Sequence, residues 1–221
     1  GTMTITNTAR ALNLHARRNN RGRNRGRDRV GHPLPPLFLM TDETRLKDPL
    51  AILDRLPPGA GIILRHYGDD QASKARFTLA TALAAACRTR RLKLIIAADP
   101  ALALAIGADG LHIPEWMALR DSFVTRIRAR RPGFIVTCAC HSARALQIAG
   151  KIGADAALLA PVFATRSHPG TVTLGVLRFA ALARTSPIPV YALGGIDAAQ
   201  AQRLQGTMAA GIAGISFINT P

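Results

Sequence analysis

The sequence predicts an α/β fold, a closed (β/α)8 barrel of the TIM type. Eight short apolar runs alternate with seven longer helical patterns between residues 37 and 216. The runs are apolar almost throughout, as expected for parallel strands that are buried on both faces. A doubly wound open sheet is the alternative, but the first strand-to-helix turn lacks the glycine fingerprint of that fold.

Each element follows from its own pattern. The apolar runs predict eight strands, at residues 37–41, 60–65, 92–98, 109–113, 134–139, 155–162, 188–193 and 211–216. Helical spacing of apolar residues and stops at Pro or Gly predict seven helices, at 46–56, 72–90, 100–106, 117–130, 142–152, 174–184 and 197–204. Asp197 is a good N-cap for the last of these helices.

The predicted barrel lacks its C-terminal eighth helix, because only residues 218–221 follow the last strand. Residues 4–16 have weak helical potential and could fold back into the gap. A partner chain is the other candidate to cover it, so a homo-oligomer stays open.

Two regions are expected, an Arg-rich mobile N-terminal arm at 1–34 and the barrel at 35–221. The net charge is +16, and the arm alone holds eight arginines against one acid, Asp28. Residues 17–29 include no apolar side chain, so nothing offsets the entropy of ordering them. Aromatic residues do not alternate with these arginines, so stacking on bases is not indicated. A nucleic-acid partner is therefore not expected, except through the arm.

Composition excludes several classes of protein. Hydrophobic residues make up 48% of the chain, which excludes full disorder. No apolar run approaches the roughly 18 residues of a membrane span, so no membrane partner is expected. The three cysteines are odd in number and lack metal-ligand spacing, which favours a cytoplasmic protein. Cys138 and Cys140 are expected on opposite faces of a strand, and therefore not as a redox pair.

The active site of such a barrel lies at the C-terminal ends of its strands. Four of the six histidines follow predicted strands. His141 is the candidate acid–base group, because imidazole titrates near neutral pH; the alternative is a solvent-facing residue. His112 is a candidate substrate contact or a packed core histidine. The other candidate substrate contacts are Arg65, Thr165, Ser167 and His168.

The strongest mechanistic signal is a pair of glycines. Gly194 and Gly195 stand between a strand and the helix that Asp197 caps, and the next strand ends with Ile215 and Ser216. Loops after the seventh and eighth strands of these barrels commonly bind phosphate through backbone N–H groups. These four residues are the predicted phosphate cradle, with a tight turn that binds nothing as the alternative.

Seven motifs occur in a fixed order: LxLMTD, IILR, LALAIGADGLHI, CHSARAL, APVFATRSHPG, LGGI and GIAGISF. Together they resemble the thiamine-phosphate synthase/TenI family over residues 37–218. The resemblance implies a (β/α)8 barrel and a small phosphorylated ligand of the thiazole or thiamine type. It also places a thiazole phosphate on the predicted cradle.

This family has two activities. Its synthases join a hydroxymethylpyrimidine diphosphate to a thiazole phosphate with Mg2+, and its tautomerases aromatise a thiazole carboxylate phosphate by proton transfer. The synthase pattern is altered here, with Ala97–Ala98 in place of an Asn–Asp pair and Trp116–Met117 near the second metal-binding Asp. Asp99 and Glu115 are weak metal candidates beside those positions.

These departures favour tautomerase-like chemistry, in which the resemblance gives the catalytic role to His141 and no cofactor is needed. The first alternative is a Mg2+-dependent synthase with altered metal ligands. The second is a non-catalytic sensor of a phosphate ligand.

Overall fold

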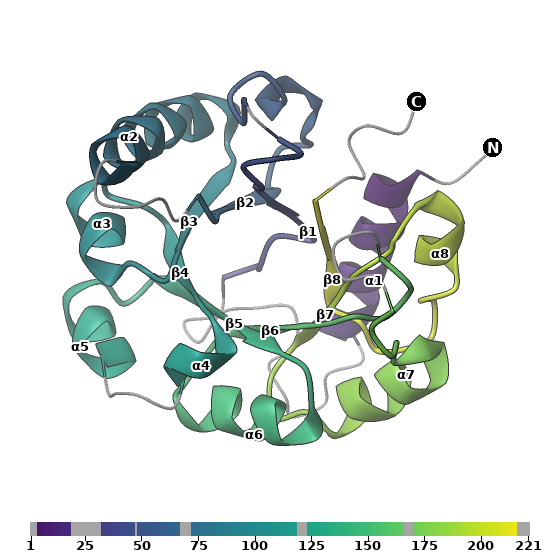
Figure 1. Ribbon diagram of the computed structural model, residues 1–221. Coiled ribbons are helices and arrows are strands. Elements are labelled where there is room, and N and C mark those ends of the chain that lie inside the picture. The colour runs from purple at the N-terminus through teal and green to yellow at the C-terminus, as the bar shows by residue number, and fades with distance from the viewer. Residues whose placement is uncertain are drawn as a thin grey trace.

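The computed structural model describes residues 4–18, 32–46, 48–66, 72–118, 123–165 and 170–215. Within them eight parallel strands close a barrel in chain order, and β8 pairs with β1 (Figure 1). The predicted fold is confirmed. The strands are β1 (Leu37–Met40), β2 (Gly61–Leu64), β3 (Lys93–Ala97), β4 (Gly110–Ile113), β5 (Ile135–Cys140), β6 (Ala156–Leu159), β7 (Val190–Leu193) and β8 (Gly211–Gly214).

Helices surround the barrel, and none of those described is long and apolar enough to cross a membrane. They are α1 (Ile5–Arg18), α2 (Ala72–Arg90), α3 (Pro100–Ala105), α4 (Glu115–Ala118), α5 (Phe123–Arg130), α6 (Ala143–Lys151), α7 (Gly175–Thr185) and α8 (Ala198–Gln202), with a 3-10 turn η1 (Leu53–Arg55). The prediction of a helix at 46–56 is wrong, because the described residues of this segment form only the 3-10 turn η1. The helix expected at 117–130 is divided into α4 and α5, with residues 119–122 outside the described part.

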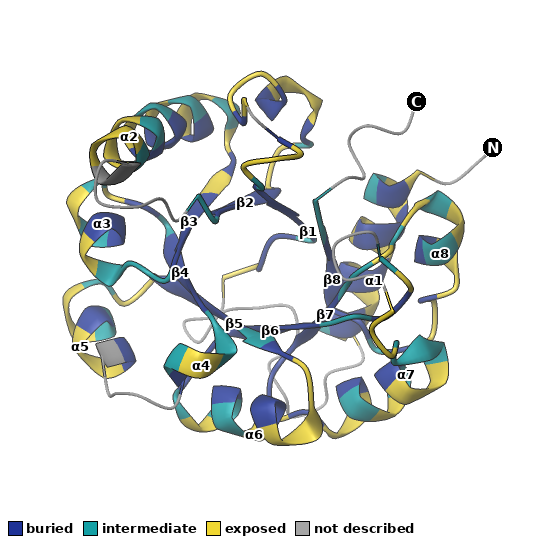
Figure 2. Ribbon diagram, in the orientation of Figure 1, coloured by how far each residue is buried: buried dark blue, intermediate teal, exposed yellow. Residues whose placement is uncertain are grey.

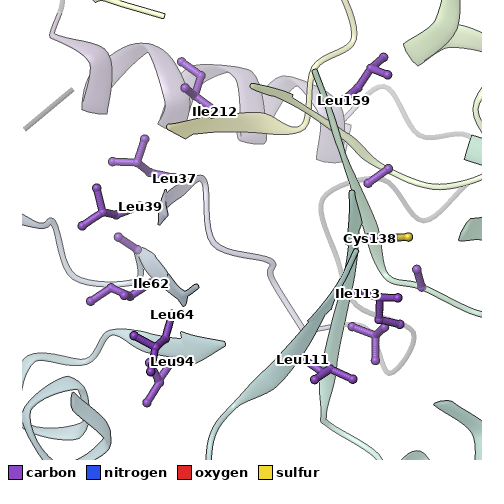
Figure 3. Close-up of a cluster of buried hydrophobic side chains, with 14 of the residues drawn as sticks. Leu37, Leu39, Ile62, Leu64, Leu94, Leu111, Ile113, Cys138, Leu159 and Ile212 are labelled. Atoms are coloured by element: carbon purple, nitrogen blue, oxygen red, sulfur yellow. The ribbon is translucent and has the colours of Figure 1, made fainter. Parts of the chain in front are cut away.

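Alternate residues of each strand face opposite sides of the barrel wall. Leu37 and Leu39 pack outward in the cluster that also contains the helices, whereas Phe38 and Met40 belong to the inner cluster. Figure 2 shows the strands buried and the outer faces of the helices exposed. Figure 3 shows side chains of the outward-facing cluster, for example Leu39 of β1, Ile62 of β2 and Leu159 of β6, and this cluster fills the layer between strands and helices.

Cys138 and Cys140 share one face of β5, because they are two residues apart. Both are buried in the outward-facing cluster, so their expected placement on opposite faces is wrong. A hydrogen bond with Cys138 and burial raise the pKa of the Cys140 thiol. Both cysteines are therefore packing residues in their reduced form.

The N-terminal end of the barrel interior is filled. Tyr191 is fully buried, its hydroxyl donates to the carbonyl of Pro35 at 2.6 Å, and its ring meets the edge of Phe38. Gly61 and Gly211 leave room for these rings, since a Cβ at either position would overlap Phe38 or Tyr191. The hollow part of the barrel therefore lies at the other, C-terminal end.

Helix α1 packs against β8, β1 and α8. Its buried stripe includes Ile5, Ala9 and Leu12, and the Asn13 side chain donates to the carbonyl of Ala210 at 2.8 Å. The expectation that residues 1–34 form a mobile arm is wrong for this helix, because its apolar stripe buries surface on the barrel. Folding back of residues 4–16 is the alternative that agrees with the structure. The Arg-rich residues 19–31 lie outside the described part.

Candidate functional site

The C-terminal end of the barrel holds a cavity of about 650 Å3. This size is typical of small-molecule sites. Its inner wall is mostly apolar, and its rim is polar, with charges of both signs. The lining residues are Met40, Asp42, Thr44, Arg45, Arg65, His112, Pro114, Glu115, Trp116, Ala139, His141, Ala160, Pro161, Thr165, Thr171, Leu193, Gly194 and Ile215.

Arg65 extends from the end of β2 and ties that strand end to β1. Its Nε donates to the carbonyl of Thr41 at 3.0 Å, and one Nη lies 3.3 Å from a carboxylate oxygen of Asp42. Several hydrogen-bond donors hold the pKa of Asp42 below its usual value of 3.8, and the hydroxyl of Thr44 has the largest effect. The ionised carboxylate and the guanidinium therefore neutralise each other at the cavity rim.

Arg76, on α2, makes an equivalent tie at the end of β3. One Nη donates to the carbonyl of Ala97 at 2.6 Å, and the other lies 3.4 Å from Asp99. Asp99 also caps α3 by accepting from the N–H of Leu102 at 2.9 Å. Asp99 thus has a structural role at a helix N-terminus, and it is not among the residues that line the cavity.

His112 lies on the inner face of β4 and is nearly fully buried at 3% exposure. Its Nδ1 is hydrogen-bonded to the hydroxyl of Thr137 at 2.9 Å, across the register that pairs these two residues. Burial, reinforced by the charge of Arg65, lowers the pKa of His112 to about 3. The ring therefore stays neutral at physiological pH and offers hydrogen bonds to a ligand.

His141 and Glu115 form a pair at the rim. A carboxylate oxygen of Glu115 accepts from His141 Nδ1 at 2.7 Å and from the His141 backbone N–H at 3.0 Å. The contacts hold the imidazole at the start of α6, whose N-cap is Ser142. Because Nδ1 faces Glu115, Nε2 is the ring nitrogen available for acid–base chemistry.

The two predicted cradle glycines have left-handed backbones, with φ of +104° at Gly194 and +64° at Gly195. A Cβ at Gly195 would overlap the carbonyl oxygen of Ala164, in the loop after β6. The N–H groups of Val162 and Phe163 in that loop donate to Leu193 and Gly194. Glycine is therefore required for this loop to pack against the end of β7, whether or not the turn binds phosphate.

The structure brings six of the predicted site residues to the cavity: Arg65, His112, His141, Thr165, Gly194 and Ile215. Glu115, predicted only as a weak metal candidate, also lines it. Ser167, His168 and Ser216 lie outside the described residues. Trp116, Arg45 and Thr171 were not predicted as site residues, and neither was Thr137, the buried partner of His112. Thr137 could have been predicted from the sequence. It is a polar residue in an apolar strand, and it lies two residues from Ala139, so both side chains face the inside of the barrel.

Magnesium does not fit the carboxylates of the described residues. Asp99 is engaged by Arg76 and Leu102, Asp42 by Arg65 and Thr44, and Glu115 by His141. A divalent cation needs several oxygens free of competing cations. Within the described ranges, no group of three His, Cys, Asp or Glu side chains is arranged to hold a metal ion.

A closed (β/α)8 barrel with a hollow, polar-rimmed C-terminal end is the architecture of enzymes that act on small molecules. Residues 37–218 match the family model described as thiamine monophosphate synthase, and the chain belongs to this family.

The relatives agree with this assignment. The chain is 33% identical over 185 residues to the putative thiamine-phosphate synthase 2 of Aquifex aeolicus, covering 83% of this chain and 97% of that protein. It is 32% identical to the thiamine-phosphate synthase of Lactiplantibacillus plantarum, covering 72% and 75%. The thiamine phosphate pyrophosphorylase of Pyrococcus furiosus has a similar fold, with a TM-score of 0.67, 24% identity, and 81% and 85% coverage. These names match the synthase alternative, and they do not single out the tautomerase-like chemistry favoured from the sequence.

Proposed function

We propose that this barrel binds a phosphate ester of a thiazole-type ring and moves a proton on the bound ring, with His141 as the acid–base residue. The observation that carries the proposal is the Glu115–His141 pair at the rim of the cavity. A carboxylate that holds Nδ1 leaves Nε2 to take a proton from the substrate and return it.

The cavity suits such a ligand in two ways. An apolar wall of Met40, Ala160 and Leu193 accepts a flat heterocycle, and the ends of β7 and β8 contribute Gly194 and Ile215 to the same cavity. Arg65, although its charge is paired with Asp42, also lines the cavity and presents its guanidinium at the rim. We assign the phosphate to the ends of β7 and β8, and the ring to the apolar wall.

The proposed step conserves protons. His141 Nε2 removes a proton from one ring atom of the substrate, and the resulting imidazolium is stabilised by the carboxylate of Glu115. The same nitrogen returns the proton to a carbon attached to the ring but outside it, so that the double bond to this carbon shifts into the ring and leaves an aromatic thiazole carboxylate phosphate. Buried, neutral His112 acts as a hydrogen-bond partner to the ring and does not exchange the proton.

The second candidate is the synthase reaction, in which a pyrimidine diphosphate is joined to a thiazole phosphate with release of pyrophosphate. The names of the relatives favour it. The engagement of Asp42 and Asp99 by arginines counts against it, because it leaves no carboxylate cluster for Mg2+ among the described residues.

One pair of assays separates the two reactions. Purified protein in EDTA is given the non-aromatic thiazole carboxylate phosphate, and its aromatisation is followed by absorbance and by proton NMR in D2O. In parallel, pyrophosphate release from hydroxymethylpyrimidine diphosphate and thiazole phosphate is measured with Mg2+. We expect aromatisation in EDTA and no pyrophosphate release. The opposite result establishes the synthase reaction instead.

Variants test the role of His141. His141→Ala is expected to lower kcat for aromatisation by about 10²- to 10⁴-fold, the usual contribution of general acid–base catalysis. The matched control is His15→Ala, which removes an exposed histidine of α1 and should leave kcat unchanged. Unchanged turnover in His141→Ala removes this residue from the mechanism.

A further inference from the structure

We propose that the N-terminal face of the barrel, opposite the cavity, binds the phosphate backbone of nucleic acid. In a (β/α)8 barrel each helix runs back to the N-terminal end of the next strand, so the last turns of the helices gather on this face (Figure 1). The inference is independent of the reaction in the cavity.

Twelve cationic side chains of the described residues belong to this face, which we call the basic face. They lie in the last turns of helices, directly after a helix, in η1 or at the start of β3: Arg17, Arg18, Arg55, Arg88, Arg90, Arg91, Lys93, Arg128, Arg130, Arg131, Lys151 and Arg184. Helix α1 contributes from the same side, since Asn13 and Ala16 pack beside Ala210, just before β8.

Few acids balance these charges. Asp54, Asp109 and Asp155 are the acids of the described residues on the basic face, and each has a basic partner: Arg90 at 2.7 Å, Lys93 at 2.9 Å, and Arg128. Against these three acids the described residues of the basic face carry twelve cations, so the face is strongly positive. The cavity end differs, because the arginines Arg65 and Arg76 are each matched there by an aspartate.

Helix capping does not account for this density of charge. One cation near a helix C-terminus stabilises the helix dipole by about 0.3–1 kcal/mol, and the effect is confined to the last turn. Here α2 and the residue after it carry Arg88, Arg90 and Arg91. Further cations at one helix end add mutual repulsion, which a polyanion would relieve.

The chemistry of the basic face fits phosphates. Ten of its twelve cations are arginines, whose planar guanidinium binds phosphate oxygens in a bidentate manner. An anionic membrane surface is the less suitable partner, because interfacial binding also uses apolar side chains. Of the six exposed large apolar side chains among the described residues, Leu14 lies on α1 one turn before Arg17 and Arg18, whereas Trp116, Val172 and Leu177 lie near the cavity end.

The test compares two triple variants drawn from the same three helices. Arg88→Gln/Lys151→Gln/Arg184→Gln removes exposed charges from the basic face. The control Lys74→Gln/Arg144→Gln/Arg178→Gln removes the same number of exposed arginines and lysines from the opposite ends of α2, α6 and α7.

Binding of the full chain to fluorescein-labelled 20-base-pair DNA and to RNA of the same length is followed by anisotropy at several salt concentrations. We expect affinity to fall with salt. The basic-face variant should bind at least 10-fold more weakly and lower the salt slope by about 2–3, whereas the control should change affinity less than 3-fold.

Three results would overturn the proposal. The first is no binding of either nucleic acid at low salt. The second is an equal loss in both triple variants. The third is binding to vesicles containing phosphatidylserine that is tighter than binding to either nucleic acid, which would identify a membrane surface. Circular dichroism of both variants confirms that they are folded.

Discussion

The two halves of the cavity mouth are built from different kinds of contact. At the ends of β1–β3, arginines bind the strand-end carbonyls and aspartates, as Arg65 does with Thr41 and Asp42, and Arg76 with Ala97 and Asp99. At the ends of β4–β8 the mouth has glycine turns and the exposed Glu115–His141 pair. The first half is a fixed charge network, and the second contains the groups suited to proton transfer.

The largest effect is expected at the glycine turn of the second half. Gly195→Ala should lower the free energy of unfolding by roughly 2–5 kcal/mol, because the residue is left-handed and its Cβ would overlap Ala164. Gly107→Ala is the matched control, since its φ is +67° and nothing lies within 4 Å of the added Cβ. It should cost only about 1–2 kcal/mol. The free energies of unfolding are measured in urea. Equal losses in the two variants would show that the contact with Ala164 is not what requires glycine at position 195.

The next effect tests whether the first half is structural. Arg76→Met should lower the free energy of unfolding by about 2–4 kcal/mol, because the side chain is 10% exposed and binds both Ala97 and Asp99. Asp99→Asn keeps a capping oxygen and should cost less. The Tm of the unmodified protein and of each variant is measured with and without Mg2+. A rise in Tm with Mg2+ that disappears in Asp99→Asn would make Asp99 a metal ligand after all.

A pH-dependent loss of stability is expected from His112. Its pKa is about 3 in the folded chain against 6.5 when unfolded, so its neutral form is favoured by folding. This contribution is complete above pH 6.5 and is lost as the pH falls toward 3. Between pH 7 and pH 5 it should cost about 2 kcal/mol of unfolding free energy. His112→Gln should remove this part of the pH dependence; an unchanged slope would mean that His112 is protonated in the folded state.

The smallest effect is expected at Glu115, which acts on His141 by positioning it. Glu115→Gln should lower kcat about 10-fold with little change in KM, because the exposed hydrogen bond to the imidazole loses its charge. Steady-state kinetics on the thiazole carboxylate phosphate measure both constants. A large rise in KM with constant kcat would instead assign Glu115 to ligand binding.

The sequence predicts much of this architecture because strand burial leaves a strong local pattern. Apolar runs such as Leu92–Ala98 mark the strands, and barrel topology then brings Arg65, His112 and His141 to one end. The ties made by Arg76 were not predictable, because they join α2 to β3 through tertiary packing. Residues 46–56 have helical spacing, yet Pro49 and Pro57 bracket a segment that forms only η1. The prediction that Cys138 and Cys140 lie on opposite faces failed because residues two apart on a strand share a face.

The position of α1 has a consequence for how the chain folds during synthesis. This helix leaves the ribosome before the eight strands, but its contact with Ala210 spans 197 residues, and β8 is the last of those strands to be made. Its apolar stripe must therefore remain uncovered, or be held by a chaperone, until translation of the barrel is nearly complete. We therefore expect α1 to dock late in folding. It packs on both β1 and β8, and these two strands are the edges that pair when the barrel closes.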